Sequence, residues 1–403
     1  MPEGPVHRRV VFYLPGYDPF PPRRYREIYR REGAAQAAIS GYSLTIGATG
    51  RPDLPYGWTV TADPDGTPAD TRVHVLHWTD IVRQSMGGGV LATYLLLLRT
   101  FWIYLSTGAM GRLFRLRKGP VLTAMYPVVM LLGQLAIAML VGFGLGFLLS
   151  LWLPGWMALP LGMLVLPPVL WWFRRIDGRL YAYYLLHDYG FTARHYGANP
   201  PALEARMSEF TALVAAALRE DVDEVLVVGH SSGVHLGVSI LADVLRGGHV
   251  RDGGPALSFL SLGQAVPMQS FLPRADRLRA DLHYLSRSDQ VVWVDVSAPA
   301  DPCCYALCDP VAVSGAGGEG KRWPLVLSAA FSQTLRPETW ARLRHRFFRL
   351  HFQYLHAFDR PGDYDYFAIT AGSVTLGARF GHRQPSAQRK ETVLSPHLSR
   401  GAA

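Results

Sequence analysis

The sequence contains few cysteines and few lysines, and both shortages narrow the class of protein. Three cysteines in 403 residues are too few for a secreted scaffold held together by disulfides. Lysine accounts for 3 of the 40 basic residues and arginine for the other 37. The net charge of +9 comes with no recognisable nucleic-acid motif, so we expect no nucleic-acid partner. Hydrophobic residues make up 49% and charged residues 18%, which excludes intrinsic disorder.

Charged side chains and histidine are absent from residues 119–173. A helix needs about 20 apolar residues to cross a bilayer, so this run is long enough for two crossings. Near its middle, Trp152 and Trp156 flank a Pro-Gly pair, and indole rings beside a tight turn suit a membrane interface. The run predicts a transmembrane hairpin with helices at about 120–151 and 156–173, and a buried hairpin of a soluble core is the alternative.

Basic residues flank the hairpin on both sides. They are Arg112, Arg115, Arg117 and Lys118 before it, and Arg174, Arg175 and Arg179 after it. By the positive-inside rule both ends face the cytoplasm, which predicts a multi-pass protein of the inner (cytoplasmic) membrane with its main domain on the cytoplasmic side. Gly142 and Gly146 form a GxxxG pattern, which predicts close helix packing or, alternatively, a dimer contact. The oligomeric state stays open.

The segment before the hairpin is also apolar. Residues 90–110 contain one charged side chain, Arg99, and follow three consecutive glycines at 87–89. This pattern predicts an interfacial helix that is joined flexibly to the preceding chain and leads into the membrane. The whole membrane insert is expected at 87–179.

The parts outside the insert have the pattern of one α/β domain. Strands are predicted at 8–14, 58–61, 72–78, 224–228, 257–262 and 291–296, and helices at 22–40, 201–219, 232–245 and 340–355. Their alternation predicts a doubly wound, mostly parallel sheet. The N-terminal part of this domain is expected at 1–86, the C-terminal part at 180–380, and a mobile polar tail at 381–403.

The clearest chemical motif directly follows the strand predicted at 224–228. The sequence Gly229-His230-Ser231-Ser232-Gly233 is a G-x-S-x-G motif between that strand and a predicted helix. Such a turn projects the serine oxygen beyond the edge of the sheet, and its two glycines avoid collisions in strained backbone. The helix N-terminus also stabilises negative charge that forms near the serine. The motif predicts a nucleophilic Ser231, with an ordinary glycine-rich turn as the alternative.

On this GHSSG elbow and the order of its elements, the chain resembles the α/β-hydrolase superfamily, in particular its lipase and esterase members. The resemblance covers the two α/β parts and implies a sheet of α/β-hydrolase type. It also implies a serine, a carboxylate and a histidine in that chain order, with no cofactor and no metal. The inserted hairpin departs from the usual soluble pattern.

The resemblance places the acid on a loop after a later strand, with the base beyond it. Asp301, just past the strand at 291–296, is the predicted acid, and Asp309 is the alternative. Among the downstream histidines, His351 is the predicted base that takes the proton of the serine, and His356 is the alternative.

An oxyanion hole requires backbone N–H groups that point at the charge forming on a carbonyl oxygen. Ser232, the residue after the predicted nucleophile, is expected to supply one of them. The loop after the first strand is expected to supply another, from Gly16 or Tyr17, although a simple Pro-Gly turn is an equal alternative there.

The three cysteines, Cys303, Cys304 and Cys308, cluster between the two candidate acids. A metal site would need a further cysteine pair or histidines at ligand spacing, and the sequence has none nearby. We therefore expect small buried residues beside the acid's loop, and no bound metal.

Together these features predict a membrane-anchored serine hydrolase that cleaves a carboxylic ester of a lipid or another hydrophobic acyl compound. Its expected partners are the lipid bilayer and that substrate, and the helix at 90–110 is expected to line an access path or cover the serine. The alternative is a catalytically silent α/β-hydrolase-like scaffold or partner-binding protein of the membrane. Placement of His351 or His356 near Ser231 would favour the enzyme.

Overall fold

The computed structural model describes residues 4–48 and 54–400, so the outermost residues of the predicted N-terminal part and of the tail lie outside it. Within these ranges, eight strands form one sheet in the order β2-β3-β4-β1-β5-β6-β7-β8. They are β1 (Arg8–Leu14), β2 (Leu44–Ala48), β3 (Gly57–Ala62), β4 (Ala69–Val75), β5 (Glu224–His230), β6 (Ala256–Leu262), β7 (Val292–Ser297) and β8 (Leu325–Ser328). From β4 to β8 neighbouring strands are parallel, whereas β2 and β3 add an antiparallel edge. The predicted α/β class with a mostly parallel sheet is confirmed.

Strands β1 and β5 lie side by side in the centre of the sheet, which unites the two parts of the domain across the insert. Both are continuous apolar runs, as is typical of parallel strands covered on both faces. At their start, Arg9 Nε donates to Glu224 Oε2 over 2.6 Å, and both side chains are fully buried. The Arg9 guanidinium also donates to the carbonyl oxygens of Gly372 and Val374, so this ion pair is hydrogen-bonded on several sides.

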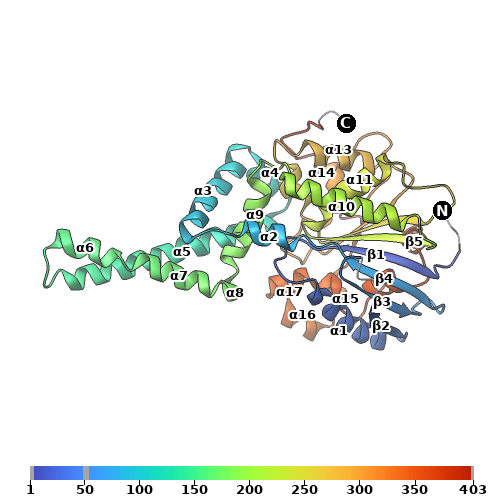
Figure 1. The fold of residues 1–403 in the computed structure, drawn as a ribbon, viewed down its shortest axis with the longest axis horizontal. Helices are drawn as coiled ribbons and strands as arrows, with labels where there is room; N and C mark the ends of the chain where they lie inside the picture. The colour runs from blue at the N-terminus through green and yellow to red at the C-terminus, as the bar shows by residue number, and fades with distance from the viewer. Residues whose placement is uncertain (1–3, 49–53, 401–403) are drawn as a thin grey trace.

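Helices cover both faces of the sheet (Figure 1). One face packs against α10 (Pro201–Ala217), α11 (Gly233–Arg246) and α13 (Asp276–Leu285). The other packs against α1 (Arg23–Ser40), α16 (Pro337–Leu343), α17 (Phe347–His351), α18 (Tyr366–Ala371) and α19 (Leu376–Phe380). The short helices α2 (Thr79–Ser85), α12 (Val266–Ser270), α14 (Pro310–Val313), α15 (Phe331–Thr334) and the 3-10 helix η1 (Gln353–Leu355) complete the domain.

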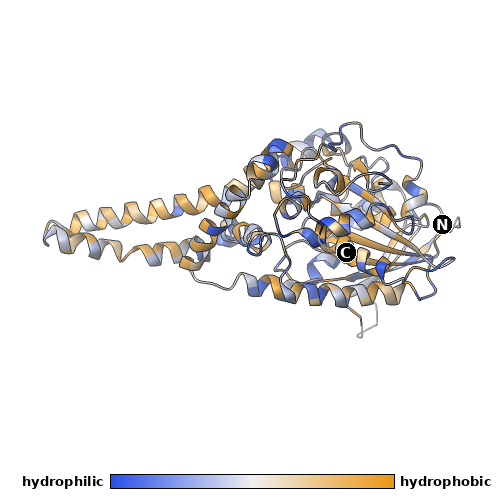
Figure 2. Ribbon diagram, turned by 90° about the horizontal axis from the view of Figure 1, so that it is seen from above, coloured by the Kyte–Doolittle hydropathy of each residue, from blue (hydrophilic) through white to orange (hydrophobic). Residues whose placement is uncertain are grey.

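The insert extends from one end of this domain as a long helical hairpin (Figure 1). Its helices are α3 (Val90–Ser106), α4 (Ala109–Leu116), α5 (Lys118–Leu149), α6 (Gly155–Met163), α7 (Leu166–Arg175) and α8 (Asp177–Leu180). The next helix, α9 (Ala182–Ala193), lies beyond the insert predicted at 87–179 and packs against α3 and α5. The hairpin is apolar along most of its length (Figure 2). By length and composition, α5 and the combined α6 and α7 are each sufficient to cross a membrane. Their bounds lie close to the predicted 120–151 and 156–173.

Glycines let the two arms of the hairpin approach closely. Gly162 of α6 packs against Gly142 and Gly146 of α5, and a Cβ on Gly162 would lie 2.4 Å from the Gly146 nitrogen. The GxxxG pattern therefore serves close packing within the hairpin, as predicted from its small residues. A dimer contact through it stays a prediction.

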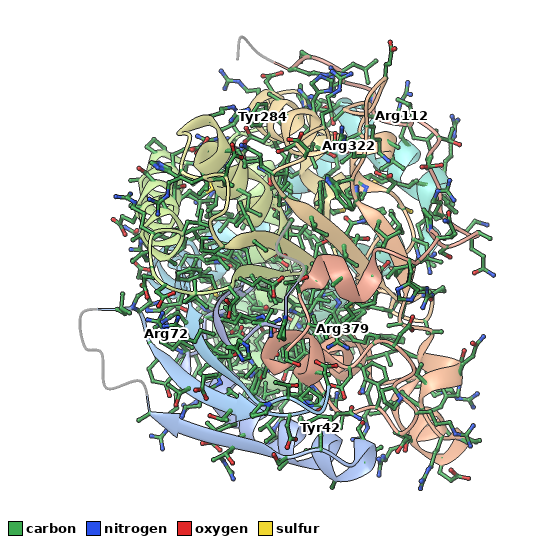
Figure 3. All side chains as sticks on the ribbon, turned by 90° about the vertical axis from the view of Figure 1, so that its right-hand side faces the viewer. Tyr42, Arg72, Arg112, Tyr284, Arg322 and Arg379 are labelled. Atoms are coloured by element: carbon green, nitrogen blue, oxygen red, sulfur yellow. The ribbon has the colours of Figure 1, made fainter. Side chains whose placement is uncertain are left out.

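The end of the domain remote from the hairpin is polar and faces the viewer in Figure 3. Two of the four arginines labelled there form ion pairs with acidic side chains. Arg72 forms an ion pair with Glu220, and Arg379 forms one with Asp65 over 2.8 Å. Most of the exposed large apolar side chains, by contrast, lie on the insert.

The structure differs from the sequence-based prediction in several elements. Strands β2 and β8 were not predicted, and the strand expected at 72–78 is β4, which begins and ends three residues earlier. The single helix predicted at 340–355 is divided into α16, α17 and η1. Hydrogen bonds of Tyr354 with the Asp301 carboxyl and the Ala298 N–H hold this segment against the sheet edge, so tertiary contacts override its helical periodicity.

The segment predicted to be a mobile tail lies along the domain. Lys390 exchanges backbone hydrogen bonds with Leu307 and Asp309, and its Nζ donates to the Leu116 carbonyl oxygen over 2.7 Å. Further on, Arg279 Nε donates to the Ser399 carbonyl oxygen over 2.6 Å. These contacts hold residues 381–400 against the domain and against α4.

Candidate active site

Ser231 lies in the turn between β5 and α11, at the carboxyl end of a central strand. Its φ is +57°, a left-handed conformation that residues other than glycine rarely adopt. Its N–H donates to the carbonyl oxygen of Leu262, at the end of β6, over 2.9 Å. Because such strained backbone is concentrated at functional sites, the conformation fits the predicted nucleophile elbow.

The two glycines of the motif lie where other residues would collide with the chain. A Cβ on Gly233 would lie 2.2 Å from the Leu14 carbonyl oxygen, and a Cβ on Gly229 would lie 3.0 Å from the Val234 Cα. The contact at Gly233 is too short for real atoms without a shift of the backbone, and the contact at Gly229 would require a smaller adjustment. The glycines therefore allow β1, β5 and α11 to approach one another around Ser231.

Asp301 and His351, the predicted acid and base, lie against each other. Asp301 is fully buried on the loop after β7, and His351 is the last residue of α17. His351 Nδ1 lies 2.7 Å from Asp301 Oδ2. The carboxyl also accepts hydrogen bonds from the Cys303 N–H (2.9 Å) and the Tyr354 hydroxyl (3.1 Å). The carboxyl is thereby oriented from three directions.

The electrostatics of this pair favour an ionised Asp301. Burial alone would raise the pKa of the Asp301 carboxyl, but the charge and hydrogen bond of His351 and the Cys303 N–H outweigh it and lower that pKa. An ionised carboxylate accepts the proton of Nδ1, which leaves Nε2 of His351 as the basic nitrogen. This is the tautomer that a general base requires.

One cavity of about 820 Å³ brings the predicted nucleophile and base together. Ser231 and His351 both line it. The turn after β6 contacts both residues: Leu262 accepts the Ser231 N–H, and a Cβ on the adjacent Gly263 would lie 3.3 Å from Cε1 of His351.

The alternative acid and base have other partners. His356 Nδ1 lies 2.7 Å from the Phe352 carbonyl oxygen, and its Nε2 lies 4.0 Å from Glu32. Asp309 accepts the first free N–H groups of α14 and lies 2.5 Å from Lys321 Nζ. Neither is paired as Asp301 and His351 are, so the geometry favours the first choices.

The predicted oxyanion donors lie beside the serine, but one of them is engaged. The Tyr17 N–H donates to Ser232 Oγ over 2.8 Å, so this N–H already has an acceptor. Gly16 packs directly on the elbow, where a Cβ would lie 3.1 Å from both Ser231 Cβ and Ser232 Oγ. The backbone of Gly16 and the N-terminus of α11 at Ser232 are therefore the best placed donors.

One wall of the cavity comes from α9, just beyond the predicted insert, and from the start of α5, whereas no residue of the helix predicted at 90–110 lines it. Tyr184, Asp188 and Thr192 of α9 line it, together with Pro120 of α5. Burial raises the pKa of Asp188 to about 7, an effect that His351 partly opposes. A lone acidic residue within the otherwise apolar and aromatic run 182–193 was the available sequence signal. The edge of the sheet that carries Ser231 thus faces the base of the hairpin.

Three potential metal ligands meet beside the cavity. Ligand atoms of Asp301, Cys303 and His351 lie within 4.8 Å of one another. Burial and the nearby Asp301 raise the pKa of the Cys303 thiol well above its ordinary value, so the thiol stays protonated. Nδ1 of His351 is engaged by the carboxylate, and the Cys303 N–H donates to the same carboxyl, so in this geometry the cluster forms the Asp301–His351 pair.

Comparison of the chain with known protein families, with curated protein sequences and with solved structures finds no match. The chemistry of the site consequently has to be judged from its own geometry.

Proposed function

We propose that this protein is a membrane-anchored serine hydrolase that cleaves a carboxylic ester of a lipid or another hydrophobic acyl compound. One observation carries the proposal. A serine on a strained strand-to-helix turn shares a cavity with a histidine whose other ring nitrogen is bonded to a buried aspartate. That combination matches the requirements of an activated nucleophile: a base, and a third group that orients the base.

In the proposed reaction, Ser231 Oγ attacks the ester carbonyl carbon while His351 Nε2 takes the hydroxyl proton. Asp301 stabilises the imidazolium that forms, and N–H groups at Gly16 and Ser232 stabilise the oxyanion. The intermediate collapses as the alcohol leaves with the proton from His351, and an acyl-enzyme remains. Water then attacks the acyl-enzyme by the same steps, which releases the carboxylic acid and restores Ser231.

The insert supports a membrane location for this chemistry. Helices α5 and α6–α7 have the length and composition of spans, and basic residues at both ends favour a cytoplasmic position for the catalytic domain. The cavity that contains Ser231 is lined in part by Pro120, at the start of α5. A substrate that partitions into the inner leaflet of the membrane would therefore be concentrated beside the site.

Labelling with a fluorophosphonate probe tests the proposal directly, because the probe reacts with activated serines. Membranes containing the wild type, Ser231→Ala and Ser288→Ala are compared, and Ser288 is a serine remote from the elbow. We expect labelling of the wild type and Ser288→Ala and none of Ser231→Ala. Absence of labelling in folded, membrane-inserted wild type would contradict the hydrolase proposal and favour a catalytically silent scaffold.

A further inference from the structure

A second cavity lies at the base of the insert. Its walls come from α3, α4, the first turns of α5, and α9. Apolar side chains dominate the lining, among them Leu97, Phe101, Leu113, Val121, Met125 and Leu186. No Asp, Glu, Lys, Arg or His is among the residues that form it, within the part of the chain that the structure describes. A space of this kind accepts hydrocarbon and rejects charged groups.

The apolar cavity adjoins the cavity of Ser231. Tyr189 and Met268 line both spaces, so the two meet at these side chains. The Tyr104 hydroxyl donates to the Met268 carbonyl oxygen over 3.0 Å, and the Tyr305 hydroxyl donates to Met268 Sδ over 3.1 Å. Methionine is an adaptable apolar side chain, and its movement away from Tyr305 would join the cavities.

Helix α3 brings the apolar cavity into contact with the membrane region. Its outer face exposes Leu91, Leu95, Leu98 and Trp102, each more than half accessible, while its inner face contributes Leu97 and Phe101 to the cavity. Exposed apolar surface of this extent marks a membrane or protein contact, and the hairpin likewise exposes large apolar side chains such as Leu122 and Val129. The cavity therefore lies between the bilayer surface and the catalytic serine.

We propose that this apolar cavity holds the acyl chain of the ester, so that the substrate class is a long-chain acyl ester drawn from the bilayer. The inference rests on the proposed hydrolase function and adds a chain-binding site to it. With the carbonyl carbon at Ser231, the chain passes Tyr189 and Met268 and lies between α3 and α5. Each further methylene buried there strengthens binding, which favours long chains over short ones.

Filling the cavity tests this assignment. Ala124 of α5 lines the cavity, whereas Leu122, two residues away on the same helix, is exposed on the outer surface. We expect Ala124→Trp to lower hydrolysis of p-nitrophenyl palmitate about tenfold or more while hydrolysis of p-nitrophenyl butyrate is retained. The smaller substitution Ala124→Leu should give an intermediate effect, and the matched control Leu122→Trp should leave both rates unchanged.

The butyrate rate and fluorophosphonate labelling show that each variant is folded and active. An unchanged palmitate-to-butyrate ratio in an active Ala124→Trp would overturn the chain-binding site and leave the hydrolase proposal standing. If the wild type hydrolyses neither ester, the hydrolase proposal itself is refuted. Photocrosslinking with a diazirine-bearing palmitate tests the chain-binding site independently. Crosslinks to α3 and α5 that are lost in Ala124→Trp would support the site. Equal crosslinking in Ala124→Trp and Leu122→Trp would refute it.

Discussion

His230 holds the backbone of His351, the predicted base, from the position directly before the nucleophile. Its Nε2 lies 3.0 Å from the His351 carbonyl oxygen, and the two imidazole rings lie 4.8 Å apart. Burial, followed by the influence of His351, lowers the pKa of His230 to about 3, so its ring stays neutral and donates an N–H. The residue directly before Ser231 therefore holds His351 in place through its backbone.

Replacing His230 by leucine removes this donor. We expect His230→Leu to lower kcat about 10- to 100-fold with little change in KM, because a small displacement of His351 misaligns proton transfer. His230→Gln retains a neutral donor and should recover part of the rate. Steady-state kinetics on a soluble ester, with a pH profile for each variant, measure the effect. Full activity in a folded His230→Leu would refute the positioning role.

Replacing each of the two candidate acids by asparagine distinguishes a catalytic carboxylate from a structural one. Asp301→Asn is expected to reduce kcat about 10⁴-fold, because an amide in place of the carboxylate favours the wrong tautomer of His351. Asp309→Asn keeps an oxygen for the α14 N-terminus and loses only the charge paired with Lys321, so its rate should stay close to wild type. Measured rates in the reverse order would move the acid to Asp309.

A methyl group at Gly16 would press on the elbow. The added Cβ would lie 3.1 Å from Ser231 Cβ and Ser232 Oγ, so the loop must shift away from the serine. We expect Gly16→Ala to slow fluorophosphonate labelling about 10²-fold, the usual effect of losing one oxyanion donor. Gly111→Ala is the control, because a Cβ at Gly111 has no neighbour within 4 Å. Equal labelling rates would exclude the loop from the oxyanion hole.

The carboxyl of Asp188 makes stability depend on pH. Its pKa in the folded protein is about 7, above the ordinary 3.8, so the folded chain keeps a proton that the unfolded chain releases. The free energy of unfolding therefore has its full contribution from Asp188 below about pH 4, and this contribution is lost as the pH rises to about 7. The loss is at most about 4 kcal/mol, and it is smaller where solvent reaches the cavity.

Asp188→Asn should remove this dependence. We expect the Tm of the variant, measured in detergent, to fall less between pH 5 and pH 8 than that of the wild type. Asp289→Asn, a substitution of an exposed carboxyl, is the control and should follow the wild type. Parallel Tm curves for wild type and Asp188→Asn would mean that Asp188 is not held protonated in the cavity.

Local patterns were sufficient for the elements that depend on few neighbours. A charge-free run predicts apolar helices from composition alone, and the structure has them at Lys118–Leu149 and Gly155–Arg175. The elbow at Ser231 was also predictable, because two glycines around a serine between a strand and a helix describe a backbone conformation that few residues can adopt.

Spacing along the chain could not choose among residues whose roles depend on distant partners. His351 and His356 lie five residues apart in similar aromatic sequence, yet His351 is bonded to Asp301 while His356 lies near Glu32. The short edge strands β2 and β8 were missed for the same reason, since pairing with β3 and β7 rather than their own pattern stabilises them.

The sequence by itself determined the apolar hairpin, the alternation of strands and helices, and the serine elbow, because each is encoded within a few turns of chain. Only the tertiary structure decided that Asp301 faces His351, that Asp188 joins the cavity wall, and that the polar segment ending near Ser399 packs on the domain. These relationships join segments far apart in sequence. They depend on burial and on hydrogen-bond partners that exist only once the sheet has formed.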